Sequence, residues 1–144
     1  MKNTKLLFAA LAIALVFGLA SCGSKDSTDP ALNGTWASAD DPEDSITFNN
    51  GTFEVKRQMK GTYTTSGNKI TMTMTHMWGT PMGLDAKWYS KSELLALPGL
   101  TDDLKEIINE GFATQEKATY SISGSTLTIT SDFNPDSPET LIKQ

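Results

Sequence analysis

Hydrophobic and polar residues follow two different patterns along the chain. Near the N-terminus an uncharged apolar run extends from Leu6 to Leu19, after Lys2 and Lys5. From about Leu32 onward, apolar residues instead alternate with polar ones at a period of two, and Gly, Asn, Asp and Ser separate the alternating stretches. The first pattern is typical of a secretory signal peptide, whereas the second predicts short β-strands joined by tight turns.

The alternating stretches predict an all-β domain. The clearest stretch, Lys69 to Trp78, places threonines on one face, and its other face carries Ile70, Met72, Met74, His76 and Trp78. We expect eight strands near residues 34–38, 44–49, 52–58, 60–65, 69–78, 86–91, 115–123 and 126–132, and Thr140 to Lys143 is a further candidate. Eight antiparallel strands are enough to close an up-and-down β-barrel.

Turn residues predict three hairpins. Asn49-Asn50-Gly51 lies between two alternating stretches, and Asn-Gly tolerates the positive φ angles of tight hairpin turns. The segment KGTYTTSGNKITMT, residues 60–73, also aligns with KATYSISGSTLTIT, residues 117–130, so that each copy reads as strand, Ser-Gly turn and strand. Either an internal duplication explains this likeness, or it reflects the small number of residue types that form tight hairpin turns.

One helix is predicted between the two similar hairpins. Its expected residues are a cap at Thr101, acidic residues at Asp102 and Asp103, an apolar stripe of Leu104, Ile107 and Ile108, and an end at Gly111. Pro98-Gly99 separates this helix from a shorter helical turn at residues 92–97.

The leader, a linker and the alternating region divide the chain into three parts. Residues 1–21 form the predicted signal peptide, residues 22–31 (CGSKDSTDPA) a small, polar tether, and residues 32–144 the barrel domain. The apolar run has 14 residues, fewer than the about 20 that a membrane-spanning helix needs. Export is therefore expected, and a permanent transmembrane helix is not.

Leu19-Ala20-Ser21-Cys22 resembles the lipobox of bacterial lipoproteins. The resemblance implies cleavage before Cys22 and acylation of its thiol, with chains such as palmitate, so that lipid anchors the domain in the membrane of the cell envelope. Gly23, which is not Asp, implies by the same resemblance the outer membrane, with the periplasmic or surface side left open. The alternative is an ordinary signal peptide followed by a free thiol, since Cys22 is the sole cysteine.

The mature domain is acidic. The full chain carries a formal charge of −5, and removal of Lys2 and Lys5 with the leader leaves −7. Such a balance, without a cluster of Lys and Arg, disfavours nucleic acid and anionic lipid headgroups as partners.

Gly34-Thr35-Trp36 resembles the Gly-x-Trp motif on the first strand of lipocalins, which are small β-barrels. The resemblance covers about residues 32–132 and implies a lipocalin-like barrel. In that family an arginine from the last strand packs on the motif tryptophan, whereas Arg57, the sole arginine here, lies on an early strand. The resemblance does not name a ligand.

Large apolar and aromatic side chains are expected to point into the barrel. The candidates are Trp36, Phe48, Phe53, Tyr63, Met72, Met74, His76, Trp78, Trp88 and Tyr120. They can line a cavity for a small hydrophobic ligand, or they can simply form the core of a solid barrel. The first reading predicts a ligand-binding lipoprotein. The second predicts a protein-interaction module, such as an envelope inhibitor, an adhesin or an assembly subunit, that uses loops like the apolar segment 75–88.

No catalytic, cofactor or metal site is expected. Sequence motifs for a nucleophile elbow, a phosphate loop or a cysteine nucleophile are absent, and one His with one Cys gives no metal-ligand spacing. His76 is expected to be a hydrogen-bonded core residue. The acidic residues between Asp40 and Asp44 lack the spacing of a calcium loop.

Overall fold

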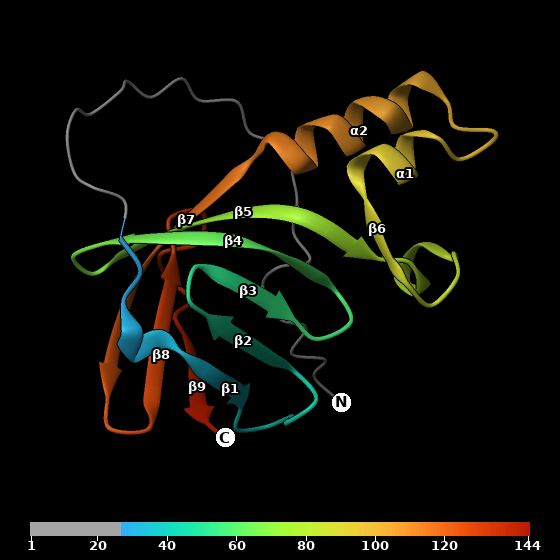
Figure 1. The fold of residues 1–144 in the computed structure, drawn as a ribbon. Coiled ribbons are helices and arrows are strands. Elements are labelled where there is room, and N and C mark those ends of the chain that lie inside the picture. The colour runs from blue at the N-terminus through green and yellow to red at the C-terminus, as the bar shows by residue number, and fades with distance from the viewer. Residues whose placement is uncertain (1–26) are drawn as a thin grey trace.

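Nine antiparallel strands and two α-helices make up the described part of the chain, residues 27–144 of a computed structural model (Figure 1). The strands are β1 (Gly34–Ser38), β2 (Ser45–Asn49), β3 (Thr52–Val55), β4 (Met59–Ser66), β5 (Lys69–Trp78), β6 (Trp88–Ser90), β7 (Gln115–Ser123), β8 (Thr126–Ser131) and β9 (Glu139–Lys143). The helices are α1 (Lys91–Leu95) and α2 (Asp102–Ala113), and two short 3-10 helices are η2 (Pro30–Leu32) and η3 (Thr80–Met82).

Eight of the strands close into a barrel. The ring runs β1-β2-β3-β4-β5-β7-β8-β9 and returns to β1, and β6 pairs only with the end of β5. The predicted eight-stranded, lipocalin-like barrel is therefore confirmed, but its membership differs from the expectation. The stretch near residues 86–91 lies outside the ring, and the candidate strand at the C-terminus closes it.

Glycine and asparagine make the predicted hairpins. Asn50 and Gly51 have φ angles of 45° and 92°, so both central residues of the β2–β3 turn are left-handed, as a twisted two-residue hairpin requires. The similar hairpins β4–β5 and β7–β8 also share their register, because Tyr63 lies opposite Met72 and Tyr120 opposite Ile129.

Inward-facing side chains fill the barrel. The core consists of Leu32, Trp36, Ile46, Phe48, Phe53, Val55, Tyr63, Ile70, Met72, Ala118, Tyr120, Leu127, Ile129 and Leu141. All are at most 7% exposed. Aromatic rings contact each other inside, since Phe48 and Tyr63 meet edge to face with centroids 5.0 Å apart.

One end of the barrel is closed around Trp36. Its indole Nε1 donates to the carbonyl oxygen of Leu32 at 2.7 Å, and Lys143 of β9 places its ammonium 5.0 Å from the ring centroid. The sequence left open which cation packs on this tryptophan, because Arg57 lies on the wrong strand. Lys143, on the last strand, occupies the place that the lipocalin resemblance gives to an arginine.

The described part of the predicted tether is held against the same end. Ser27 pairs with Thr65 in an isolated bridge, and the Tyr120 hydroxyl donates to Asp29 Oδ2 at 2.8 Å. Asp29 also accepts the amide of Ala31 and so caps η2. The signal peptide, the lipobox and Cys22 lie outside the described residues.

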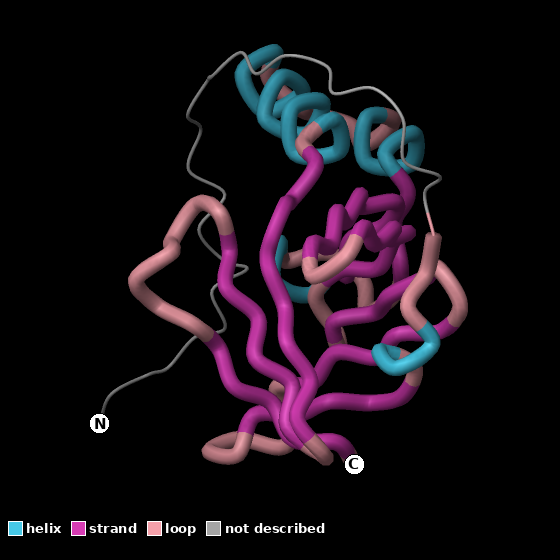
Figure 2. Tube along the Cα trace, turned by 90° about the vertical axis from the view of Figure 1, so that its left-hand side faces the viewer, coloured by secondary structure: helices cyan, strands magenta, loops and turns pink. Residues whose placement is uncertain are grey.

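The two helices lie beside each other beyond one end of the sheet (Figure 2). Ser90 and Glu93 form a reciprocal capping box at α1, and the Thr101 side chain caps α2 by accepting the Leu104 amide, as predicted. The expected end at Gly111 is wrong. Gly111 is buried within α2, and the helix continues to Ala113.

Removing the hydroxyl of Tyr120 is expected to lower the free energy of unfolding by about 1.5 kcal/mol, because its bond to the Asp29 carboxylate is lost. Burial and Asp29 raise the pKa of Tyr120 to about 12. The matched Tyr63→Phe change should cost less than about 0.5 kcal/mol, because the buried Tyr63 hydroxyl has no hydrogen-bond partner among the described residues. Urea denaturation of Tyr120→Phe and Tyr63→Phe compares them, and equal losses would contradict the assignment.

Candidate functional site

Six of the predicted interior residues are core residues. They are Trp36, Phe48, Phe53, Tyr63, Met72 and Tyr120. They belong to one cluster of buried side chains from neighbouring strands, and each is at most 7% exposed.

A bulge in β5 changes the direction of two further predicted residues, His76 and Trp78. Gly61 pairs with Met74 and Lys60 pairs with His76, so Thr75 is the extra residue on β5. Directly opposite residues of an antiparallel pair share a face, and Lys60 is opposite the outward-facing Glu54.

Beyond the bulge, the predicted alternation is therefore reversed. His76 and Trp78 face the outside of the wall, and the inward position passes to Met77, which lies opposite the buried Tyr89. Met74, before the bulge, keeps its inward direction but is only half-buried. The expectation that His76 and Trp78 belong to the interior face is wrong for this reason.

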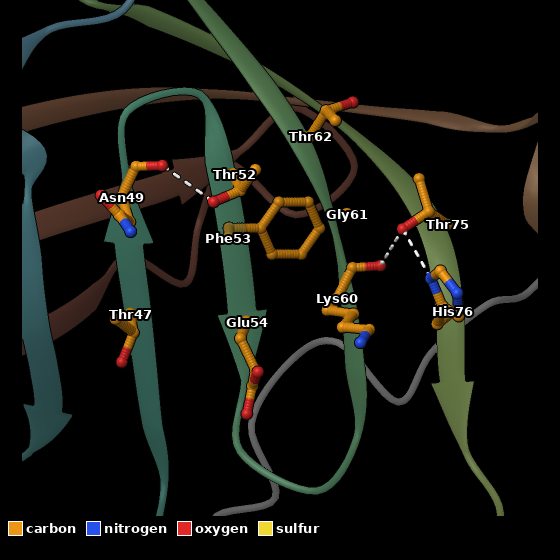
Figure 3. Close-up of a pocket in the computed structure, with 10 residues that line it drawn as sticks. All are labelled: Thr47, Asn49, Thr52, Phe53, Glu54, Lys60, Gly61, Thr62, Thr75 and His76. Atoms are coloured by element: carbon orange, nitrogen blue, oxygen red, sulfur yellow. Dashed lines mark hydrogen bonds between the residues drawn. The ribbon is translucent and has the colours of Figure 1, made fainter. Parts of the chain in front are cut away.

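A pocket of about 380 Å³ lies on the outer wall at this bulge (Figure 3). It is lined from four consecutive strands by Thr47, Asn49, Thr52, Phe53, Glu54, Lys60, Gly61, Thr62, Thr75 and His76. Outward-facing threonines supply much of this lining, and Phe53 reaches it from inside the wall beside Gly61. Sequence reasoning missed this site because it followed the inner face alone.

Several polar groups of the pocket are already paired. The Thr75 hydroxyl donates to the Lys60 carbonyl oxygen at 3.2 Å and lies 3.0 Å from His76 Nδ1 (Figure 3). The Thr52 hydroxyl donates to the Asn49 carbonyl oxygen at 2.8 Å. Within residues 27–144 the side chains of Glu54 and Thr62 form no hydrogen bond or ion pair, so they are available to a ligand.

Two tryptophans form a ridge next to the pocket. Trp78 and Trp88 are opposite each other on β5 and β6, and their rings meet edge to face with centroids 5.0 Å apart. Lys60, which lines the pocket, places its ammonium 5.0 Å from the Trp88 ring. Both tryptophans are half-buried, so part of each ring is open to solvent beside the polar lining. We call this pair the Trp78–Trp88 ridge.

Two glutamates face inward at the other end of the barrel from Trp36. Glu116 lies opposite Met72, and Glu139 lies opposite Ile129, both partners being core residues. Burial raises the pKa of Glu116, and burial followed by the charges of Asp44 and Glu116 raises that of Glu139.

Replacing these two glutamates by glutamine should stabilise the protein at neutral pH. Folding raises the pKa values of both carboxyl groups, so the folded state is favoured while the two groups are protonated. This contribution to stability is lost as the pH rises through the raised pKa values and the carboxyl groups ionise. We expect Glu116→Gln and Glu139→Gln each to gain on the order of 0.5 kcal/mol at pH 7 and nothing near pH 3. Thermal melts across this range measure it, with the exposed Glu106→Gln as control, and a gain that persists at low pH would refute it.

The apolar stripe of α2 is only partly covered. Leu104 and Ile107 are 46% and 49% exposed, although the sequence pattern marks them as a buried face. Ile108, Gly111 and Phe112 are more covered, and α2 contacts α1 and β5. The helix therefore presents unburied leucine and isoleucine to solvent, which is a feature of binding surfaces.

Metal binding finds no support in the described region. The acidic loop before β2 is a turn in which Asp41 Oδ1 accepts the Glu43 amide, and Glu43 pairs with Lys56 at 2.9 Å. Among residues 27–144, no group of three or more His, Cys, Asp or Glu side chains is arranged to hold a metal ion.

The comparisons with known proteins give no relative. No protein family, curated protein or solved structure matches this chain. In the part of the chain that is described, neither helix has the length and apolar character to span a membrane.

Proposed function

We propose that this chain is a lipid-anchored protein of the outer membrane of the cell envelope, whose barrel binds a partner protein through the exposed face of α2. The observation that carries the proposal is the filled interior, because 14 core side chains occupy the volume that a ligand carrier would keep free. Binding then falls to the outer surface.

The exposed face of α2 has the chemistry of a helix that fits a groove. Leu104 and Ile107 are three residues apart and therefore project from the same side, as anchors of an amphipathic helix do. Around them α2 carries four acidic residues, Asp102, Asp103, Glu106 and Glu110, and one basic residue, Lys105, which pairs with Asp102 at 3.0 Å. This charge favours an apolar groove rimmed by lysine and arginine.

The position of the helix suits an anchored protein. Ser27 pairs with Thr65 at one end of the β4–β5 hairpin, whereas α1 follows Ser90, which pairs with His76 near the other end. If Cys22 is acylated, four residues separate it from Ser27, and the five steps between the two Cα atoms span at most about 18 Å. The lipid would hold the Trp36 end near the bilayer and leave α2 free to meet a partner.

The anchor and the solid core can be tested on the full chain. Mass spectrometry of the protein extracted from the membrane should find acyl chains on Cys22, and Cys22→Ser should release the protein from the membrane fraction. Native mass spectrometry of the chain in detergent should find no stoichiometric apolar ligand. A retained fatty acid or haem in the barrel would overturn the solid-barrel proposal in favour of a carrier.

The partner site is tested by cross-linking in the envelope. A photoreactive residue at Ile107 should trap one defined protein, and the same residue at Thr128, on the outer wall of β8, should not. In pull-downs, Leu104→Ser and Ile107→Ser should each reduce capture about tenfold, and higher salt should weaken it. Equal cross-linking from positions 107 and 128, or capture unchanged by both serine variants, would contradict the proposal.

A further inference from the structure

We propose that the outer-wall pocket and the Trp78–Trp88 ridge together form a binding site for a neutral saccharide chain. This site lies on β2 to β6 and does not depend on α2 or on a protein partner. It is therefore a second binding surface, and the test of this site is independent of the test of the partner site on α2.

The backbone itself builds the hollow. Gly61 lies opposite Phe53, and a Cβ at this position would come within 2.9 Å of Phe53 Cε1 and would overlap the carbonyl oxygen of Thr73. The absence of a side chain at Gly61 leaves room for the Phe53 ring, and both residues line the pocket. The bulge at Thr75 lies across from it and directs Thr75 and His76 into the rim.

The lining matches a ligand rich in hydroxyl groups. The Thr62 hydroxyl can both donate and accept hydrogen bonds, as sugar hydroxyls do. The Thr52 and Thr75 hydroxyls donate within the chain and can still accept, and the Asn49 amide can donate. The two charged side chains, Glu54 and Lys60, are directly opposite each other on β3 and β4 and have opposite signs. The pocket therefore favours a neutral ligand over a phosphate or a nucleic acid.

The adjacent aromatic ridge supplies the apolar half of such a site. The C–H faces of a sugar ring are apolar and pack on aromatic rings, whereas the edges of the sugar need hydrogen bonds. Trp78 and Trp88 remain partly exposed on the same outer face as the pocket, and Lys60 connects the two, since it lines the pocket and covers Trp88. The turn of His76 and Trp78 to the outside is what brings polar lining and ridge together.

The site can be tested by NMR titration of the ¹⁵N-labelled full chain in a polyoxyethylene detergent, which contains no sugar. The probes are four neutral trisaccharides. Three are β-1,4-linked and consist of N-acetylglucosamine, of glucose or of xylose, and the fourth is maltotriose. We expect at least one of them to shift the amides around Gly61, Thr62 and Thr75 saturably, with a dissociation constant of about 0.1–5 mM.

Four variants assign the binding to this site. Trp88→Ala should weaken binding about tenfold or more, and Lys60→Ala and Thr62→Val about threefold to tenfold. The control Thr128→Ala, an outward threonine on β8, should bind as the unchanged chain does. Thr62→Val, which keeps the shape of the side chain, decides the result if Trp88→Ala does not fold.

Three outcomes would overturn the proposal. One is a folded chain whose amides do not move with any probe at about 10 mM. Another is a set of shifts that map to α2 or to the far side of the barrel. The third is binding by folded Thr62→Val and Lys60→Ala that equals that of the unchanged chain.

Discussion

A Gly61→Ala chain is expected to lose about 3 kcal/mol or more of its free energy of unfolding, which is near the upper range for a single methyl group. The added Cβ would overlap the backbone oxygen of Thr73 and press on the Phe53 ring. Thr73 belongs to the hydrogen-bonded β4–β5 pair, so its carbonyl cannot move without disturbing the strand. Phe53, at 4% exposure, has little room to turn aside.

Urea or thermal denaturation measures this loss, and a glycine in a hairpin turn provides the control. Gly67 has a φ of 61°, and no atom lies within 4 Å of the place where its Cβ would be. Because asparagine tolerates that backbone conformation, Gly67→Asn should change stability by less than about 1 kcal/mol. A Gly61→Ala protein as stable as Gly67→Asn would show that the barrel wall has room for a methyl group at Gly61.

A chain that ends at Pro138 is expected not to fold into the barrel. The missing strand β9 is hydrogen-bonded on one side to β1 and on the other to β8, so its loss opens the ring and leaves two unpaired edges. Leu141, which is 1% exposed, and Lys143, which covers Trp36, would be lost with it. The cost of such a deletion is comparable to the whole stability of a small domain.

Near-ultraviolet circular dichroism and size-exclusion chromatography of the shortened chain give the answer. The control ends at Lys143 and lacks only Gln144, whose amide donates to the Thr35 carbonyl oxygen at 3.0 Å. That chain should remain folded. A folded, monomeric chain ending at Pro138 would mean that β1 and β8 close the ring without β9.

The sequence predicted those features of the fold that depend on neighbouring residues. Alternation located the strands, Asn50-Gly51 located a hairpin turn, and Thr101 located the start of α2. Each of these is a local property, because side-chain direction, positive φ and helix capping involve residues within a few positions of one another.

Features that depend on distant strands were not predictable in the same way. The bulge at Thr75 arises from the count of residues on β4 against β5, and the segment itself does not reveal it, since Met74, Met77 and Trp78 are all apolar. Once the count changes by one, the two faces exchange, so His76 and Trp78 moved from a predicted interior to the candidate saccharide site.

The two candidate sites show the same limit. The pocket residues come from four strands and were seen in the sequence as an ordinary polar face. The stripe on α2 was read correctly as apolar, but a pattern cannot say whether a partner within the chain covers it. Only the three-dimensional structure shows that the barrel leaves Leu104 and Ile107 exposed.

Strand β9, which follows all the other strands of the ring in the sequence, completes the ring. β1 can pair with β2 early in folding, because the two strands are close in the sequence. Its other partner, β9, lies about a hundred residues further along the chain, so that pairing has a high contact order. Until β9 is paired, β1 and β8 have unpaired edges and the apolar inner face of the sheet is not enclosed. Closure of the ring therefore comes late in folding, because it joins β1 to β9, the two barrel strands that are farthest apart in the sequence.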